Sequence, residues 1–271
     1  QKIKVENQNK IIEEKNKEIT DSIKYAQKIQ KALLNVEENI HIISTDYFIL
    51  FKPRDIVSGD FYWTNITDNS LYVAVADCTG HGVPGAFMSM LGISSLNDII
   101  NAHKNISPAE ILDLLRKNII SNLGQTGKIG ENKDGMDISL CKISKNISDY
   151  NIEFAGANNS LFYVSPKENH INEIKPNKQP VGYSPDYTSF NNNKLILEKD
   201  TTIYMTTDGF TDQFGGKNNK KYKISQLKDN ILEICKLPCA EQQIKLDEYF
   251  NSWKGDMEQI DDVCVMGIKL I

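Results

Sequence analysis

The first 40 residues contain a seven-residue apolar repeat, which limits the structures that this part of the chain can adopt. The segment contains no Gly, Pro or Cys and is dense in Lys, Glu, Asn and Gln. The apolar positions at intervals of seven, followed by those between them, are Val5, Ile12, Ile19, Ala26, Leu33, Ile23, Ile29 and Val36. This period predicts a coiled-coil helix over residues 1–40 that pairs with a second copy. In the N-terminal half, the positions between the heptad positions are polar. The alternative to a paired coiled coil is therefore a single helix packed on the domain surface.

From about residue 45 the pattern changes to short β-rich runs. These predict strands at 46–51, 60–66, 71–77, 137–143, 150–155, 161–165, 195–198, 201–207 and 263–270. Helices are predicted in pairs, at 83–104 and 107–123 and again at 224–235 and 240–253. Sequential strands with inserted helix pairs indicate an α+β fold, so we expect one domain over 45–271. The Gly/Asn/Lys-rich segments 124–135 and 215–223 are expected to be mobile loops.

Composition excludes several classes of protein. The 271 residues include 36 Asp and Glu against 31 Lys and Arg, a net charge of −5, so a dedicated nucleic-acid binder is not expected. The five scattered cysteines form no C-x-x-C pair, which predicts reduced thiols, no zinc site and a cytoplasmic location. We expect no membrane span and no signal peptide. The chain begins at Gln1 rather than Met, so we expect a fragment of a longer parent protein, which could itself be tethered to a membrane.

Four aspartates stand at the ends of apolar, strand-like runs: Asp60, Asp77, Asp208 and Asp262. One such aspartate alone is usually a turn former or a helix cap. If the four strand ends converge, however, the carboxylates repel one another unless cations neutralise them. Oxygen-only ligands favour Mg²⁺ or Mn²⁺, and a pair of such ions suits attack of water on phosphorus. The spacing therefore indicates a candidate metal-dependent hydrolase.

Seven sequence blocks make this pattern familiar. In chain order they are KPRDIVSGDFYW, VADCTGHGVPGAFMSM, GMDISLCKI, FAGANNSLFYV, PVGY, MTTDGFTDQ and DDVCVMGI. Together they closely resemble the SpoIIE-type branch of the metal-dependent (PPM-like) serine/threonine protein phosphatases, over roughly residues 45–271. Residues 22–34 are also similar to the linker that precedes this domain in multidomain bacterial sensors.

The resemblance implies a fold and a set of metal ligands. The family folds as a four-layer α/β/β/α sandwich of two mostly antiparallel sheets flanked by helices, here preceded by the long N-terminal helix. Two Mn²⁺ or Mg²⁺ ions are implied, with Asp60 on one metal and Asp77 bridging both. Asp208 and Asp262 match the ligands of the other metal, and Cys78 matches a position that contributes its backbone carbonyl.

Four further residues are candidates for binding substrate. Arg54 is one of only two arginines and is expected either to orient the phosphoryl group or to form a structural ion pair. Gly80 and His81 begin a G-H-G loop, where the histidine either donates to substrate or packs locally. Asp137 stands either near the metals or in a structural turn. The basic segment 217–223 either docks an acidic phosphoprotein or is a solvated loop.

The expected function is hydrolysis of phosphoserine or phosphothreonine on a regulatory protein by a metal-bound hydroxide. Relatives of this kind act on STAS-type, anti-anti-sigma-like proteins. The chain would be the output domain of a larger bacterial signalling protein, with an upstream sensor and a homodimer through the N-terminal helix. The alternatives are a catalytically silent, dimeric binding module, and a nucleotide-binding enzyme resting on residues 80–85.

Overall fold

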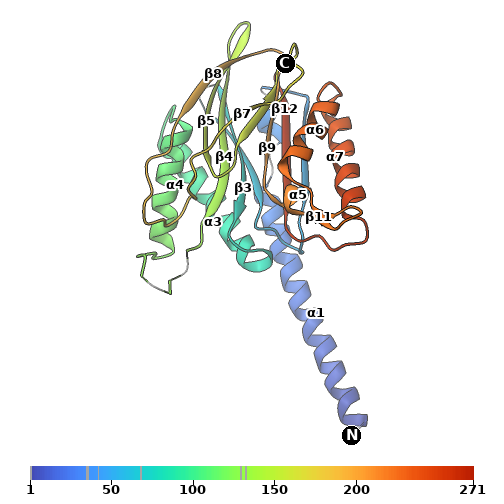
Figure 1. Cartoon of the computed structure of the whole chain (residues 1–271). Coiled ribbons are helices and arrows are strands. Elements are labelled where there is room, and N and C mark those ends of the chain that lie inside the picture. The colour runs from blue at the N-terminus through green and yellow to red at the C-terminus, as the bar shows by residue number, and fades with distance from the viewer. Residues whose placement is uncertain (1, 35–36, 42, 68, 129, 132) are drawn as a thin grey trace.

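Two five-stranded antiparallel sheets stack face to face at the centre of the molecule (Figure 1). The computed structural model describes residues 2–34, 37–41, 43–67, 69–128, 130–131 and 133–271. One sheet has the order β1-β12-β9-β6-β7, with β1 (Tyr47–Lys52), β6 (Leu161–Val164), β7 (Asn172–Ile174), β9 (Thr202–Thr206) and β12 (Val263–Lys269). The other has the order β2-β3-β4-β5-β8, with β2 (Phe61–Thr67), β3 (Ser70–Cys78), β4 (Met136–Lys145), β5 (Asp149–Ala157) and β8 (Asn193–Glu198).

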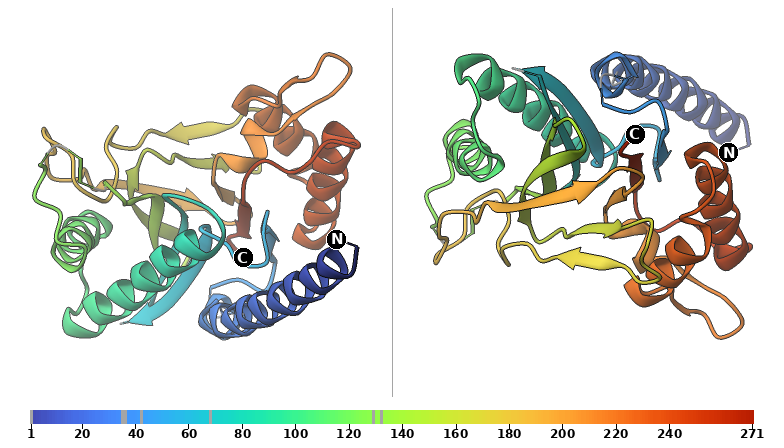
Figure 2. Two further views of the ribbon diagram at one scale, coloured as in Figure 1. Left: turned by 90° about the horizontal axis from the view of Figure 1, so that it is seen from below. Right: turned by 90° about the horizontal axis from the view of Figure 1, so that it is seen from above.

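Helix pairs cover the two outer faces of this sandwich (Figure 2). The β3-containing sheet carries α3 (Gly82–Ala102) and α4 (Pro108–Asn122), and the β12-containing sheet carries α6 (Ile224–Ile234) and α7 (Cys239–Lys254). Buried apolar side chains form three clusters, one under each helix pair and one between the sheets. The predicted α/β/β/α four-layer sandwich is therefore confirmed.

Strand β3 is buried on both of its faces. Alternate residues contribute to the core between the sheets: Leu71, Val73 and Val75. The others contribute to the core under α3 and α4: Tyr72, Ala74 and Ala76. Burial on both faces explains why the sequence of β3 is a continuous apolar run instead of an alternating one. The strand runs through the centre of the fold and ends near Asp77, at one end of the sandwich.

Helix α3 is the one described helix that is long and apolar enough to cross a membrane, by length and composition alone. From the sequence no such segment is expected. Of its most apolar stretch, 56% is buried inside the protein. It packs against α4 and the β3-containing sheet through residues such as Ile93, Leu96 and Ile100. A core helix of a globular domain gives the same signal as a membrane span, and burial on the sheet accounts for this one.

The N-terminal helix α1 (Lys2–Leu33) extends away from the sandwich over most of its length (Figure 1). Its predicted seam is exposed, with Val5, Ile12 and Ile19 between 53% and 57% accessible. Val36 lies outside the described residues. At its C-terminal end the helix joins the domain, because Gln30 is buried and Leu34 enters the core under α3 and α4. The short helix α2 (Glu37–Ile40) follows α1 and precedes β1.

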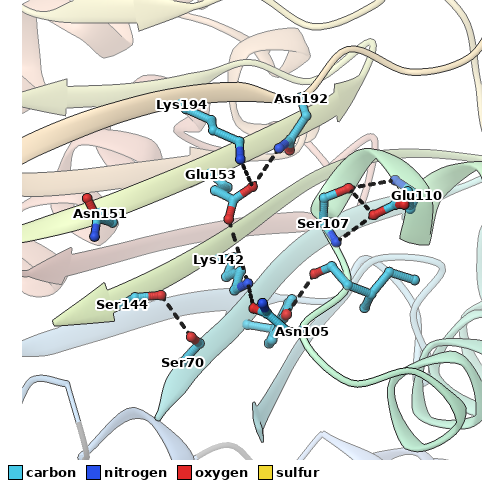
Figure 3. Close-up of polar contacts among 12 residues, drawn as sticks. Ser70, Asn105, Ser107, Glu110, Lys142, Ser144, Asn151, Glu153, Asn192 and Lys194 are labelled. Carbon is cyan, nitrogen blue, oxygen red and sulfur yellow. Dashed lines mark hydrogen bonds and ion pairs between the residues drawn. The ribbon is translucent and has the colours of Figure 1, made fainter. Parts of the chain in front are cut away.

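A polar network satisfies the one lysine that is buried in the second sheet (Figure 3). The Lys142 side chain is 5% exposed, and its Nζ donates to Asn105 Oδ1 at 2.6 Å and lies 3.6 Å from Glu153. Glu153 in turn accepts from Asn192 and pairs with Lys194. Because each charge has a partner, this network is a structural feature of the sheet.

Several short elements differ from the sequence expectation. Strand β7, the four-residue helix α5 (Gly209–Asp212) and the two-residue strands β10 (Phe214–Gly215) and β11 (Lys220–Lys221) are not predicted from the sequence. The segment 215–223, expected to be a mobile loop, instead contains the antiparallel β10–β11 pair. The reason is local: Lys221 Nζ donates to Asp212 at 2.6 Å, which ties the hairpin to α5.

Candidate metal centre at one end of the sandwich

A cavity of about 360 Å³ lies where β3 ends and β4 begins. Its walls come from β3 and the loop after it, from the segment before β4, and from the segment before β12. The lining residues are Asp77, Cys78, Thr79, Gly80, His81, Lys133, Gly135, Met136, Asp137, Pro180 and Asp261. The cavity therefore brings together five of the predicted site residues. It also includes Lys133 and Asp261, two charged residues that are not predicted from the sequence.

Asp77 and Asp137 face each other across neighbouring strands. The register of β3 on β4 pairs Asp77 with Asp137, so two carboxylates stand side by side at the cavity wall. Burial, then the charges of Asp208, Asp261 and Asp137, raise the pKa of Asp77 to about 8. Burial also raises the pKa of Asp137, while a hydrogen bond from Asn158 Nδ2 at 2.8 Å opposes that shift. This pairing favours the site role of Asp137 over a structural turn.

Asp208 approaches the same place from the other sheet. It follows β9 and is the residue at the N-terminus of α5, where its side chain makes no capping hydrogen bond. Burial and the charges of Asp212 and Asp261 raise its pKa, while a hydrogen bond with the Asp77 carboxyl group lowers it. The carboxylates of both sheets therefore interact directly.

Asp60 lies deeper, with 1% of its surface exposed. The Thr207 hydroxyl donates to Asp60 Oδ2 at 2.6 Å and accepts from the Cys264 backbone N–H at 3.0 Å. Burial, followed by the charge of Asp77, raises the pKa of Asp60 well above its ordinary value. Thr207, at the end of β9, thus connects the residue before β2 to the opposite sheet.

The final block contributes two aspartates with different surroundings. Asp262, predicted as a ligand, is 2% exposed, and its two carboxylate oxygens accept backbone N–H groups of Arg54 and Gly59, each at 2.7 Å. Asp261 instead lines the cavity. Burial is the main cause of its raised pKa. The structure therefore favours Asp261 as the carboxylate that faces the cavity, and Asp262 as the residue that holds the neighbouring backbone.

The G-H-G loop forms a sharp turn into α3. Gly80 and Gly82 have φ of 85° and 63°, a region that favours glycine. His81 stands at the N-terminus of α3 without a side-chain capping bond, and its Nδ1 lies 2.9 Å from Asp55 Oδ2. Both Gly80 and His81 line the cavity, as their predicted site role requires. The nucleotide-binding alternative, which rests on residues 80–85, does not account for Asp77, Asp137 and Asp261 at the same cavity.

The side chains of Arg54 and Cys78 have surroundings that do not suit a role in binding substrate or metal. The Arg54 guanidinium donates to the Ile260 carbonyl at 2.9 Å, and Arg54 is not among the lining residues, which favours its structural role. The Cys78 thiol is buried, and burial raises its pKa well above the ordinary value. Any contribution of Cys78 to a metal therefore falls to its backbone carbonyl.

The donor set fits hard divalent cations. Every candidate ligand atom is an oxygen, a donor set that suits Mg²⁺ or Mn²⁺. Burial is the largest cause of the raised pKa values of Asp60, Asp77 and Asp208, and the negative charges of neighbouring aspartates raise each of them further. Within the described part of the chain, no three His, Cys, Asp or Glu side chains are already gathered as a metal cluster. Asp77, Asp137 and Asp261 line the cavity, whereas the predicted ligands Asp60, Asp208 and Asp262 are not among its lining residues.

Known proteins resemble this chain in sequence and in fold. Phosphoserine phosphatase RsbU of Bacillus subtilis (strain 168) is 27% identical over 203 residues, which is 72% of this chain and 55% of RsbU. The chain thus spans about half the length of that relative. The solved SiaA-PP2C domain of Pseudomonas aeruginosa is 30% identical, with a TM-score of 0.83 over 94% of this chain and 98% of that domain.

A further solved structure, RsbX in complex with magnesium, is 17% identical with a TM-score of 0.54, over 83% of this chain and 94% of RsbX, and so shares the fold. The family model "Stage II sporulation protein E (SpoIIE)" matches residues 67–271. Since that match takes in every strand from β3 onward and well over half of the chain, the protein belongs to the SpoIIE family of PPM-type serine/threonine protein phosphatases.

Proposed function

We propose that this chain hydrolyses phosphoserine or phosphothreonine on a regulatory partner protein with the help of two divalent cations. One observation carries the proposal: carboxylates from both sheets interact at a single cavity, and burial together with their mutual repulsion raises their pKa values. Carboxylates held together at such a cost in desolvation and repulsion indicate a site that binds cations. The family assignment makes a phosphoester the substrate class.

The residues that would hold the cations are Asp60, Asp77, Asp208, Asp261 and the carbonyl of Cys78. When bound, Mn²⁺ or Mg²⁺ supplies positive charge that activates water at neutral pH and stabilises the developing charge on the phosphoryl oxygens. The cations have to displace protons from the ligands, because the pKa of Asp77 is about 8. This set differs from the sequence prediction at one position, where Asp261 replaces Asp262.

The chain's other residues keep these ligands in place. Thr207 fixes one oxygen of Asp60, and Asp262 holds the Gly59 backbone directly before it. His81 is half exposed at the cavity, and Asp55 orients its ring through Nδ1. We assign His81 the task of donating a hydrogen bond or a proton to the substrate's oxygens.

The same proposal includes the protein's partners. RsbU is named a phosphoserine phosphatase, and by analogy we place the substrate phosphate on a regulatory protein of the STAS, anti-anti-sigma type. We further propose that α1 forms a homodimer through its exposed apolar seam and transmits the state of an upstream sensor. The setting we propose for these reactions is the cytoplasm.

Phosphate release from a phosphoserine peptide tests the function. Chelator-treated protein should be inactive and should regain activity when Mn²⁺ or Mg²⁺ is added. The Asp77→Asn variant should stay inactive with either ion. A phosphotyrosine peptide of the same sequence serves as the control for substrate class. Equal rates with and without chelator would refute the proposal.

A further inference from the structure

The cavity has almost no positive charge to receive a phosphate group. Of the two arginines in the chain, Arg54 donates to the Ile260 carbonyl. The other, Arg116, is 2% exposed and donates to the carbonyls of Thr188 and Pro180. Neither guanidinium faces the cavity. Among the described residues that line it, Lys133 has the only lysine or arginine side chain.

Hydrogen bonds fix the segment that carries Lys133 to the end of β3. The Thr79 backbone N–H donates to the Gly135 carbonyl at 3.0 Å, and the Gly135 N–H donates to Thr79 Oγ1 at 3.1 Å. Thr79 itself stands two residues after Asp77. These hydrogen bonds join Gly135, two residues after Lys133, to the residues that follow Asp77 at the end of β3.

A second set of contacts holds the same segment from its other side. The Gln125 side chain is buried, donates to the Asp134 carbonyl at 2.6 Å and accepts from the Tyr183 backbone N–H at 3.2 Å. Pro180, close to Tyr183 in sequence, also lines the cavity. The backbone on the C-terminal side of Lys133 is thus held at both Asp134 and Gly135, while the Lys133 side chain remains exposed.

We propose that Lys133, an exposed residue in the lining of this cavity, binds the phosphoryl group of the substrate. A phosphoserine dianion that enters a cavity lined by Asp77, Asp137 and Asp261 is repelled by every carboxylate that a cation does not neutralise. A lysine on the rim supplies a compact positive charge with three donors that adapts to a tetrahedral anion. This inference rests on the proposed function and assigns it a substrate-binding residue.

The experiment compares Lys133→Met, Lys133→Arg and Lys128→Met in the full chain loaded with Mn²⁺. Lys128 is in the same loop but does not line the cavity, so it controls for loss of one loop lysine. Lys133→Met should raise KM for a phosphoserine peptide, and the inhibition constant of inorganic phosphate, by about tenfold, because hydrogen bonds to charged groups are the strong ones. Lys133→Arg should retain most of the affinity, and Lys128→Met should match wild type.

Two further measurements separate the possible failures. Calorimetric Mn²⁺ binding should be unchanged in Lys133→Met, since this residue is assigned to phosphate and not to the cations. Calorimetric binding of inorganic phosphate to the Mn²⁺-loaded protein requires no turnover, so it tests the role of Lys133 even if the wild type has no phosphatase activity. A wild type without phosphatase activity would refute the proposed function instead. Equal phosphate affinity in Lys133→Met and Lys128→Met would overturn the inference.

Discussion

Asp261 and Asp262 are neighbours in the chain that serve the site in different ways. One faces the cavity, and the other accepts two backbone N–H groups in a buried position. The first position is suited to a cation, because its carboxylate is accessible from the cavity. The second is suited to holding the chain, because both of its oxygens are already occupied. Alanine at each position separates the two roles.

Asp261→Ala should weaken Mn²⁺ binding by at least about tenfold, the range seen when groups that position or bind a metal are removed. Asp262→Ala should instead lower the free energy of unfolding of the metal-free protein by about 2 kcal/mol or more, because it leaves two buried N–H donors unpaired. Calorimetry and urea unfolding in chelator measure the two effects. If Asp262→Ala lost metal without losing stability, the two roles would be reversed.

The raised pKa of Asp77 predicts how the metal-free protein responds to pH. Its folded-state value is about 8 against an ordinary 3.8, so the folded state holds this proton more tightly than the unfolded state. The free energy of unfolding should therefore fall as pH rises from about 4 to about 8 and level off above that. Urea midpoints in chelator at pH 5, 6, 7 and 8 measure it.

Asp77→Asn is the matched control for this pH dependence. It keeps the shape of the side chain but cannot ionise, so its urea midpoint should fall less steeply over the same interval. Saturating Mn²⁺ should also flatten the wild-type dependence, because cations favour the ionised carboxylates. A wild-type midpoint that rises with pH would contradict the assigned shift.

The sequence predicts the type of these residues better than their exact position. Asp77 is recognisable because a run of apolar residues ends at it, and the register with Asp137 follows once β3 and β4 pair. The D-D pair offers two adjacent carboxylates before one strand, and only the path of the chain shows which faces the cavity. Lys133 lies in a segment with no periodicity, so sequence reasoning has no signal for it.

At the scale of elements, one buried amide provides polar contacts between α1 and the domain. Gln30 Nε2 donates to the Ser58 carbonyl at 2.6 Å and to Ser89 Oγ at 2.8 Å, and its Oε1 accepts from the Ser58 N–H at 3.1 Å. Ser58 is two residues before Asp60. Gln30 therefore connects the end of α1 to the backbone that carries a candidate ligand.

Gln30→Leu should disconnect α1 from that backbone. We expect a loss of about 1–3 kcal/mol in the free energy of unfolding, from the unpaired groups at Ser58, and a weaker affinity for Mn²⁺. Gln8→Leu makes the same chemical change on an exposed turn of α1 and is the control. Equal metal affinity in the two variants would show that α1 does not position this part of the site.

Long elements are predicted well and short ones poorly, for physical reasons. The capping box that begins α4, with Ser107 and Glu110, is readable in the sequence and is present in the structure. Helix α5 and the β10–β11 hairpin have too few residues for a periodic pattern, and contacts such as Lys221 with Asp212 determine them. Such contacts join segments that sequence patterns treat separately.

At the scale of the whole molecule, α1 presents an apolar stripe that the domain does not cover. Ile12 and Ile19 are 55% and 57% exposed on a helix that extends away from the sandwich (Figure 1). Exposed apolar residues at heptad spacing favour pairing with another helix. The homodimer stays a prediction. It assigns dimerisation to the apolar stripe of α1 and not to the surface of the domain.

Sedimentation velocity tests the dimer on the full chain. Wild type should dimerise as concentration rises, and the double variant Ile12→Asn with Ile19→Asn should remain monomeric. The matched control is Lys10→Asn with Lys17→Asn, which changes positions of the same helix outside the seven-residue apolar repeat. A monomer at every wild-type concentration, or a dimer in the seam variant, would contradict the coiled-coil assignment.

We propose above all that carboxylates from both sheets hold divalent cations at one end of the sandwich. Titration calorimetry of Mn²⁺ into the chelator-stripped 271-residue chain tests this binding, with Asp77→Asn as the comparison. We predict saturable binding to wild type and a loss of at least about tenfold in affinity in Asp77→Asn. No saturable binding to wild type, or equal binding to both proteins, would contradict it.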